Sequence, residues 1–298
     1  MTYSIVARDP ETGRFGVAVQ SHYLGVGPVV PWLEAGVGAI ATQASVNISF
    51  GPIGLELLRS GRSADEVVAA LVASDERSAV RQLGVVDVNG RAAAHTGAEC
   101  ITACGHLVRD GFSVQGNLLE RETCWPAMAA AYEAGLAEGA PFVERLLRAL
   151  EAAEGEGGDV RGRQSAAIIV VSGELQAEAW RGRILDMRIE DHQDPVPELR
   201  RIVTMQLAYD LLDDEGDAAR GGRAVAERYQ QARQMAPDAY ELVFWRGVEL
   251  ATGGDVEGGR RELEIAFAAD VRWRTTLEHL ATGGREGVTP ELAKELLA

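Results

Sequence analysis

Residues 2–20 read TYSIVARDPETGRFGVAVQ. Two apolar runs, SIVA at 4–7 and FGVAV at 15–19, flank the segment DPETG at 9–13, whose aspartate, proline and glycine are typical of a turn. Strand-forming runs on both sides of such a turn predict a β-hairpin. The fold therefore begins with a pair of antiparallel strands.

Short strands and helices alternate after this hairpin. We expect strands at 37–44, 83–88, 91–95, 112–118 and 165–171, helices at 52–59, 63–74, 122–137 and 141–154, and a last hairpin through Gly182. A capping box at 63–66 starts the second helix, and an Asn89-Gly90 turn joins two of the strands. Antiparallel hairpins interrupted by helix pairs predict an α+β fold, with layered sheets and outer helices, for a first domain at residues 1–194.

A second, all-helical domain is expected at 195–298, because the composition changes at Asp194-Pro195-Val196-Pro197. YQQAR at 229–233 and LEIAF at 263–267 lie 34 residues apart, which is the tetratricopeptide period. Gly216-Asp217 and Gly254-Asp255 are each expected to open the second helix of a repeat unit. This segment resembles tetratricopeptide repeats, and a generic helical bundle is the alternative.

Aromatic residues of this second domain fall at helical spacing. They are Phe244, Trp245, Phe267 and Trp273. Packing between helices is the favoured interpretation, and a groove for a peptide or polymer is the alternative.

The charge balance narrows the possible partners. The chain has 298 residues, with 29 lysines and arginines against 45 aspartates and glutamates, and a formal net charge of -16. Nucleic acids and anionic membranes bind basic surfaces, so we expect neither as a partner. Lys294 is the only lysine, which excludes mechanisms that need a buried lysine.

Targeting and cofactor signals are missing from the sequence. No apolar run approaches the ~20 residues of a membrane span, and no signal peptide is visible. With only Cys100, Cys104 and Cys124, the chain is expected to be cytoplasmic. Cys100, Cys104 and His106 lack a second pair for a closed zinc site, and no dinucleotide or phosphate-loop motif occurs, so we expect no metal and no cofactor. We also expect a homo-oligomer.

Thr2 is the first candidate for chemistry. A small second residue favours removal of Met1, and a freed threonine combines a hydroxyl nucleophile with its own amine as base. The usual pKa of such an amine, about 7.7–8.0, suits neutral pH. An ordinary start of translation is the alternative.

Several sequence blocks resemble the N-terminal nucleophile (Ntn) hydrolases, and in detail the Ntn-hydrolase-like family known as domain of unknown function 1028. The blocks are SIVARDPETG, FGVAV, ATQA, RQLGVV, HTG, VQGN and GDVRGRQSAA, and the resemblance covers about residues 2–191. It implies a four-layer αββα sandwich. Members can carry a C-terminal helical extension described as peptidoglycan-binding, which residues 195–298 resemble.

The resemblance also implies roles for individual residues. Thr2 would be the nucleophile, and its amine the general base. Gln20 and Ser21 would place polar groups beside it, Gln43, Ala44 and Asn47 belong to the segment whose backbone N–H groups would form the oxyanion hole, and Ser165 would lie near the amine.

Other polar residues at strand ends are candidates on their own pattern. Gln115 and Asn117 would contact a substrate carboxylate or amide, or hold a turn. His95 would act as acid, base or substrate contact, or as a structural histidine. A polar cluster precedes the strand at 165–171, where it is either a binding site or a solvated loop; its members are Asp159, Arg161, Arg163 and Gln164.

One departure from proteasome-type Ntn hydrolases bears on mechanism. Those proteins use a lysine on the third strand, and residues 29–34 contain none. Arginine cannot replace it as a base. Either the Thr2 amine works alone, in an amidohydrolase acting on a small amide, or catalysis has been lost and the chain is a binding domain joined to a protein- or glycan-binding helical module.

Overall fold

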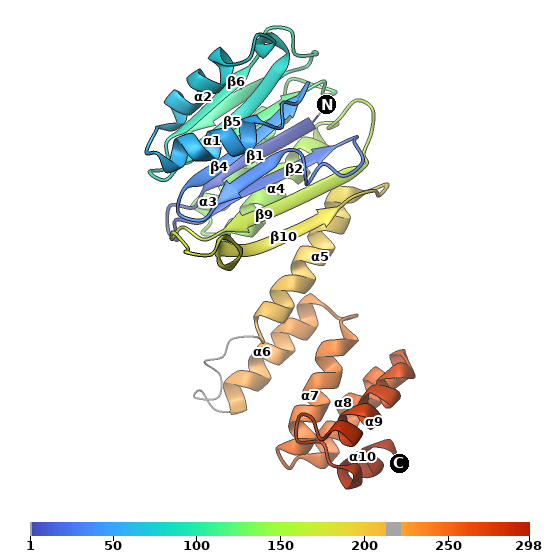
Figure 1. Cartoon of the computed structure of the whole chain (residues 1–298). Coiled ribbons are helices and arrows are strands. Elements are labelled where there is room, and N and C mark those ends of the chain that lie inside the picture. Colours follow the sequence, from blue (N-terminus) through green and yellow to red (C-terminus); the bar gives the residue numbers. More distant parts are fainter. Residues whose placement is uncertain (1, 213–221) are drawn as a thin grey trace. The chain divides into compact units, whose positions relative to one another are not determined.

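The computed structural model describes residues 2–212 and 222–298. The chain divides into two compact units, residues 1–200 and 201–298 (Figure 1). The division falls inside α5 (Pro195–Asp210), six residues after the boundary expected at residue 194. The first unit is α+β with antiparallel sheets and the second is helical, as predicted.

Two antiparallel sheets form the centre of the first unit. The six-stranded sheet has the order β10-β9-β2-β1-β8-β7, and the four-stranded sheet has the order β3-β4-β5-β6. The strands are β1 (Thr2–Arg8), β2 (Phe15–Ser21), β3 (Pro31–Glu34), β4 (Gly38–Ala44), β5 (Arg81–Asp87), β6 (Ala92–Thr96), β7 (Gly105–Arg109), β8 (Phe112–Asn117), β9 (Ser165–Val171) and β10 (Arg183–Ile189). The predicted first hairpin is β1–β2, with Tyr3 opposite Gln20.

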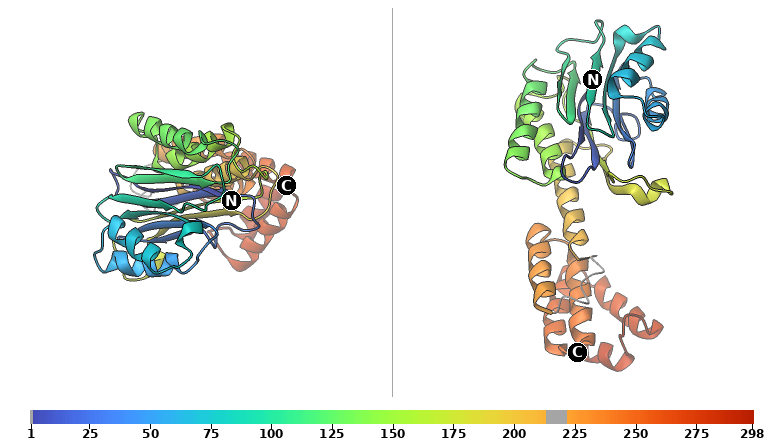
Figure 2. Two further views of the ribbon diagram at one scale, coloured as in Figure 1. Left: turned by 90° about the horizontal axis from the view of Figure 1, so that it is seen from above. Right: turned by 90° about the vertical axis from the view of Figure 1, so that its left-hand side faces the viewer.

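The two sheets face each other, and a pair of helices covers the outer face of each (Figure 2). α1 (Phe50–Arg59) and α2 (Ala64–Ala73) pack on the four-stranded sheet, while α3 (Cys124–Ala137) and α4 (Phe142–Gly155) pack on the six-stranded sheet. Short 3-10 helices, η1 (Ser78–Val80) and η2 (Ala179–Gly182), precede β5 and β10. At Gly16 a β-carbon would lie 2.5 Å from Leu146 of α4, so glycine allows this close approach.

Strand alternation assigns each side chain of β1 and β2 to a face. Val6, Val17 and Val19 point between the sheets, where they meet Ala39 and Ala41 of β4 in an apolar core. Val6 points inward, so Ser4 and Thr2, two and four residues earlier, lie on the same inner face. The inner layer is thus apolar along most of its length and polar where β1 begins.

Two strands, β3 and β7, were absent from the sequence-based assignment. β3 has only four residues and starts with Pro31, which lacks the N–H that a strand donates. β7 ends one residue before Asp110-Gly111, a turn that joins it to β8. That Asp-Gly pair is a hairpin signal that the sequence did contain.

The second unit consists of helices packed on one another. After α5 come α6 (Gly222–Met235), α7 (Tyr240–Thr252), α8 (Val256–Ala269), α9 (Arg272–Gly283) and α10 (Pro290–Leu297). Asp255 caps α8 by accepting a hydrogen bond from the Gly258 N–H, as expected for a residue that opens this helix. Gly216-Asp217 lies outside the described residues. Within the described ranges, no helix combines the length and apolarity needed to cross a bilayer.

Candidate active site

Polar side chains gather between the sheets at the end where β1 begins. The antiparallel register places Asn117 opposite Thr2 and Gln115 opposite Ser4. Gln43 of β4 reaches them from the facing sheet. These side chains are buried, so each needs hydrogen-bond partners within the protein.

Thr2 is held at both its side chain and its backbone. Its Oγ1 atom donates to Ser21 Oγ over 3.1 Å. Its carbonyl oxygen accepts from Gln43 Nε2 at 3.3 Å and from Asn117 Nδ2 at 3.4 Å. Thr2 is 5% exposed, so its hydroxyl lies in a desolvated polar environment.

Gln82 of β5 orients the two amides that hold Thr2. Its Oε1 atom accepts from Gln43 Nε2 and from Asn117 Nδ2, each at 2.8 Å. Its Nε2 atom donates to the Gly116 carbonyl at 2.8 Å and to the Gly105 carbonyl at 3.1 Å. Both the oxygen and the nitrogen of this fully buried amide have hydrogen-bond partners, so the orientation of the amide relative to Thr2 is fixed.

Ser4 continues the network along β1. Its hydroxyl donates to Gln43 Oε1 and accepts from Gln115 Nε2, both at 2.7 Å. Ser113 donates to Gln115 Oε1 at 3.0 Å. The Gln43 amide is therefore fixed at its oxygen by Ser4 and at its nitrogen by Thr2 and Gln82.

His106 of β7 lies at the other end of the network. Its Nδ1 atom is 2.8 Å from Thr96 Oγ1, which also accepts a hydrogen bond from Gln82 Nε2. Burial, assisted by the neighbouring His95, lowers the pKa of His106. The ring is thus neutral at pH 7 and connects to Thr2 through Thr96, Gln82 and the amides of Gln43 and Asn117.

Backbone strain marks two strand ends at this site. Ala44 directly follows Gln43 and has φ 68°, and Leu118 directly follows Asn117 and has φ 51°. Residues with a β-carbon rarely occupy this left-handed region, and such strain is concentrated at functional sites. Ala44 ends β4 and Leu118 directly follows β8, and these are the two strands whose amides hold the Thr2 carbonyl.

Gln20 faces the opposite side of the sheet from Thr2, and the Ser165 hydroxyl is bonded to the loop after β2. Gln20 lies opposite Tyr3, whose hydroxyl donates to Glu154 of α4, so Gln20 points toward the helices rather than between the sheets. Ser165 lies opposite Ser21, but its hydroxyl donates to the Tyr23 carbonyl at 2.5 Å and accepts from the Val26 N–H at 3.1 Å. Ser165 therefore anchors the loop after β2.

Asn47 and His95 bind the segment between α2 and β5. Asn47 Nδ2 donates to Asp75 at 2.9 Å. Hydrogen bonds from Asn47, the Arg77 backbone and Arg81 lower the pKa of Asp75 to about 2. His95 points outward, where its Nε2 atom lies 3.0 Å from the Ser78 carbonyl. Neither side chain contacts Thr2.

The predicted polar cluster before β9 is made of ion pairs. Asp159 accepts from Arg161 at 3.0 Å and from the His22 N–H at 2.9 Å, which ties it to the residue after Ser21. Arg163 pairs with Glu154 and with Asp194, and Gln164 donates to Asp191. A cavity of about 520 Å³ opens here; its lining includes His22, Arg163, Gln164, Asp191, His192 and Asp194.

Sequence reasoning missed five members of the inner polar layer. They are Ser4, Gln82, Thr96, His106 and Ser113. The available signal was a polar residue at alternate positions of a strand, as Ser113, Gln115 and Asn117 in FSVQGN at 112–117. In the described ranges, no group of three or more His, Cys, Asp or Glu side chains is arranged to hold a metal ion.

Comparisons with known proteins bear on the first unit. The sequence model of a family of unknown function, DUF1028, matches residues 2–199. A crystal structure of a protein from Silicibacter pomeroyi, described with the same family, is similar at a TM-score of 0.61 and 33% sequence identity, over 70% of this chain and 85% of that one. A comparison with curated proteins found no match.

Proposed function

The chain belongs to the DUF1028 family of unknown function, and from this premise we propose that it is an N-terminal nucleophile amidohydrolase. In this proposal the first unit is an Ntn-type αββα sandwich, Thr2 is the nucleophile, and a small amide is the substrate. The second unit is a tetratricopeptide-like extension that binds a partner.

One observation carries the proposal. The Thr2 hydroxyl is buried 3.1 Å from Ser21 Oγ, and two side-chain amides hold the carbonyl of the same residue. Catalysis benefits when a nucleophile is fixed in position before the substrate binds, because little motion remains to be restricted in the transition state. A strand that only completes a sheet would not need this polar support at its first residue.

The proposed reaction uses Thr2 twice. After removal of Met1, Thr2 Oγ1 attacks the substrate carbonyl carbon while the free α-amine takes the hydroxyl proton. The C–N bond breaks, the amine's extra proton passes to the leaving nitrogen, and an ester of Thr2 remains. Water then attacks the ester, again giving a proton to the amine, and the carboxylic acid leaves as Oγ1 regains its proton.

The charged residues support the amine as the base. Lys294, the only lysine, lies in α10 of the second unit. In the segment before β9, the guanidinium groups of Arg161 and Arg163 pair with Asp159, Glu154 and Asp194. Guanidinium keeps its proton in proteins, so these side chains adjust the local potential without exchanging a proton.

The test compares the wild type with Thr2→Ala and Thr2→Ser against a library of small amides. Both substitutions keep a small second residue, so Met1 removal is preserved and can be checked by intact mass. We expect Thr2→Ala to abolish hydrolysis and Thr2→Ser to retain it. Hydrolysis by Thr2→Ala would refute the assignment, and Met1 retained in the wild type would favour the binding-domain alternative.

A further inference from the structure

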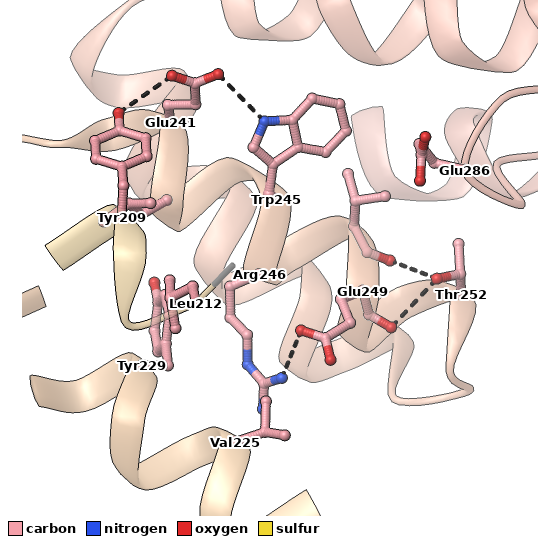
Figure 3. A pocket seen from close by; sticks show the side chains of 12 residues that line it. Tyr209, Leu212, Val225, Tyr229, Glu241, Trp245, Arg246, Glu249, Thr252 and Glu286 are labelled. Atoms are coloured by element: carbon pink, nitrogen blue, oxygen red, sulfur yellow. Dashed lines mark hydrogen bonds and ion pairs between the residues drawn. The ribbon is translucent and has the colours of Figure 1, made fainter. Parts of the chain in front are cut away.

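A second cavity, of about 680 Å³, lies in the helical unit (Figure 3). Its volume is within the range of about 300–1,000 Å³ that is usual for ligand sites. Aromatic rings and carboxylates dominate its polar lining; they are Tyr209, Tyr229, Trp245, Glu241, Glu249 and Glu286. The proposed hydrolase uses none of these residues.

One part of the cavity already holds a guanidinium. Arg246 pairs with Glu249 at 2.7 Å, and its guanidinium carbon lies 5.7 Å from the centre of the Tyr229 ring. A carboxylate and an aromatic face together stabilise a planar cation through charge and through the ring quadrupole. The cavity thus contains an internal example of arginine recognition.

Another part of the cavity has the same groups arranged around Glu241. Tyr209 donates its hydroxyl to one Glu241 oxygen at 3.1 Å, and Trp245 Nε1 donates to the other at 3.4 Å. In Figure 3 the two rings flank this carboxylate. Burial and the nearby Glu241 raise the pKa of Tyr209 to about 12, so the phenol remains a donor. Glu241 is held in place before any ligand arrives.

The cavity has a surplus of negative charge. Its lining contains Glu241, Glu249 and Glu286 but a single basic residue, Arg246, which already pairs with Glu249. Within the described ranges of the helical unit, no basic side chain pairs with Glu241 or Glu286. Trp245 is 39% exposed, so a ligand from solvent can reach its ring.

We propose that this cavity binds an arginine side chain of a peptide partner. The guanidinium would stack on Trp245 and pair with Glu241, as Arg246 does with Tyr229 and Glu249. The aliphatic stem would lie against Leu212 and Val225, which line the same cavity. Arginine is preferred over lysine because a planar guanidinium can stack on a ring and present a fork of donors to a carboxylate.

The test follows the indole N–H signals of the full-length ¹⁵N-labelled chain by NMR. The chain has five tryptophans, and Trp245→Phe identifies the signal of Trp245. The probe is acetyl-Ala-Arg-Ala-amide, and its control carries citrulline, which has the same shape without the charge. We expect the arginine peptide to shift the Trp245 signal and to bind about tenfold more tightly than the citrulline peptide.

Variants separate a specific site from general attraction to an acidic protein. Glu241→Gln should weaken binding of the arginine peptide about tenfold, because it removes the charge and keeps the side chain's shape. Glu257→Gln, an exposed site outside the cavity, should leave binding unchanged. Equal binding of both peptides, equal loss in the two variants, or an unmoved Trp245 signal at millimolar peptide would overturn the proposal. Each measurement is independent of hydrolysis.

Discussion

The side chains of Gln43 and Gln82 meet between the two sheets, with Gln43 Nε2 donating to Gln82 Oε1 over 2.8 Å. Gln43 also donates to the Thr2 carbonyl, so Gln82 determines the orientation of a group that holds the proposed nucleophile. Gln82 acts on Thr2 through Gln43 and Asn117, because both amides donate to Gln82 Oε1 and to the Thr2 carbonyl. The packing of the two sheets against each other therefore helps to set the position of Thr2.

Replacing Gln82 by leucine should destabilise the first unit. Gln43 and Asn117 would lose an acceptor and the Gly116 carbonyl a donor, all in a buried layer. A buried polar group left without a partner costs about 1–3 kcal/mol, so a loss of about 3 kcal/mol is expected. Urea unfolding measures it. The exposed Gln193→Leu is the matched control and should change stability little; equal effects of the two would contradict this role for Gln82.

Gly84 should not tolerate a side chain. A β-carbon there would lie 2.4 Å from Gln115 Oε1 and 2.5 Å from Ser113 Oγ, both fixed in the network. Overpacking of this kind costs about 1–3 kcal/mol, so Gly84→Ala should lower the melting temperature. Gly155→Ala, whose β-carbon would meet nothing within 4 Å, is the control. Equal melting temperatures for the two variants would show that the sheets make room for the added methyl group at no cost in stability.

Much of the first unit could be predicted because its signals are local. The turn at residues 9–13, the Asn89-Gly90 turn and the capping box at Ser63 each act within a few residues, and the structure contains all three features. β3 was not predicted, because it starts with Pro31 and its four residues are too few to show the usual strand pattern. The α+β class and the helical second unit follow from these local patterns.

The candidate site was predictable only in part, because it forms across sheets. Thr2, Ser21, Gln43, Gln115 and Asn117 were expected near one another, and they contact each other directly or through Ser4. Which residue bridges them depends on strand register and on the facing sheet, which no local pattern specifies. The bridging role of Gln82 therefore could not be predicted from local sequence, because it depends on how the two sheets face each other. For the same reason, the outward direction of Gln20 followed from its pairing with Tyr3.

Strain at the end of β4 can be tested by removing a methyl group. Ala44 has φ 68°, a conformation that costs a residue with a β-carbon about 1–2 kcal/mol and costs glycine almost nothing. Ala44→Gly should therefore be neutral or slightly stabilising, despite the greater freedom of glycine in the unfolded chain. Ala41→Gly, in the same strand and fully buried, should destabilise. Equal losses at the two positions in thermal unfolding would show that Ala44 stores no strain.

Asp9 and Arg145 form a buried ion pair at the far end of β1, with 2.5 Å between Asp9 Oδ1 and Arg145 Nη2 and each side chain 3% exposed. Burial opposes ionisation of Asp9, but hydrogen bonds from Thr12 and Arg145 outweigh it and lower its pKa. A carboxyl group whose pKa is lower in the folded state stabilises the protein above its unfolded pKa of about 3.9. That contribution is lost as the pH falls through the folded value.

Asp9→Asn should therefore cost most at neutral pH, where it leaves Arg145 buried without its carboxylate, a loss of about 3–5 kcal/mol. The difference from wild type should narrow below about pH 4, because the wild-type Asp9 then takes up a proton and also loses its charge. Urea unfolding at pH 7 and at about pH 3 measures both values. Asp110→Asn, in the exposed turn between β7 and β8, keeps a residue suited to that turn and should show no such dependence. A difference that stays constant with pH would mean that the Asp9 charge contributes nothing to folding.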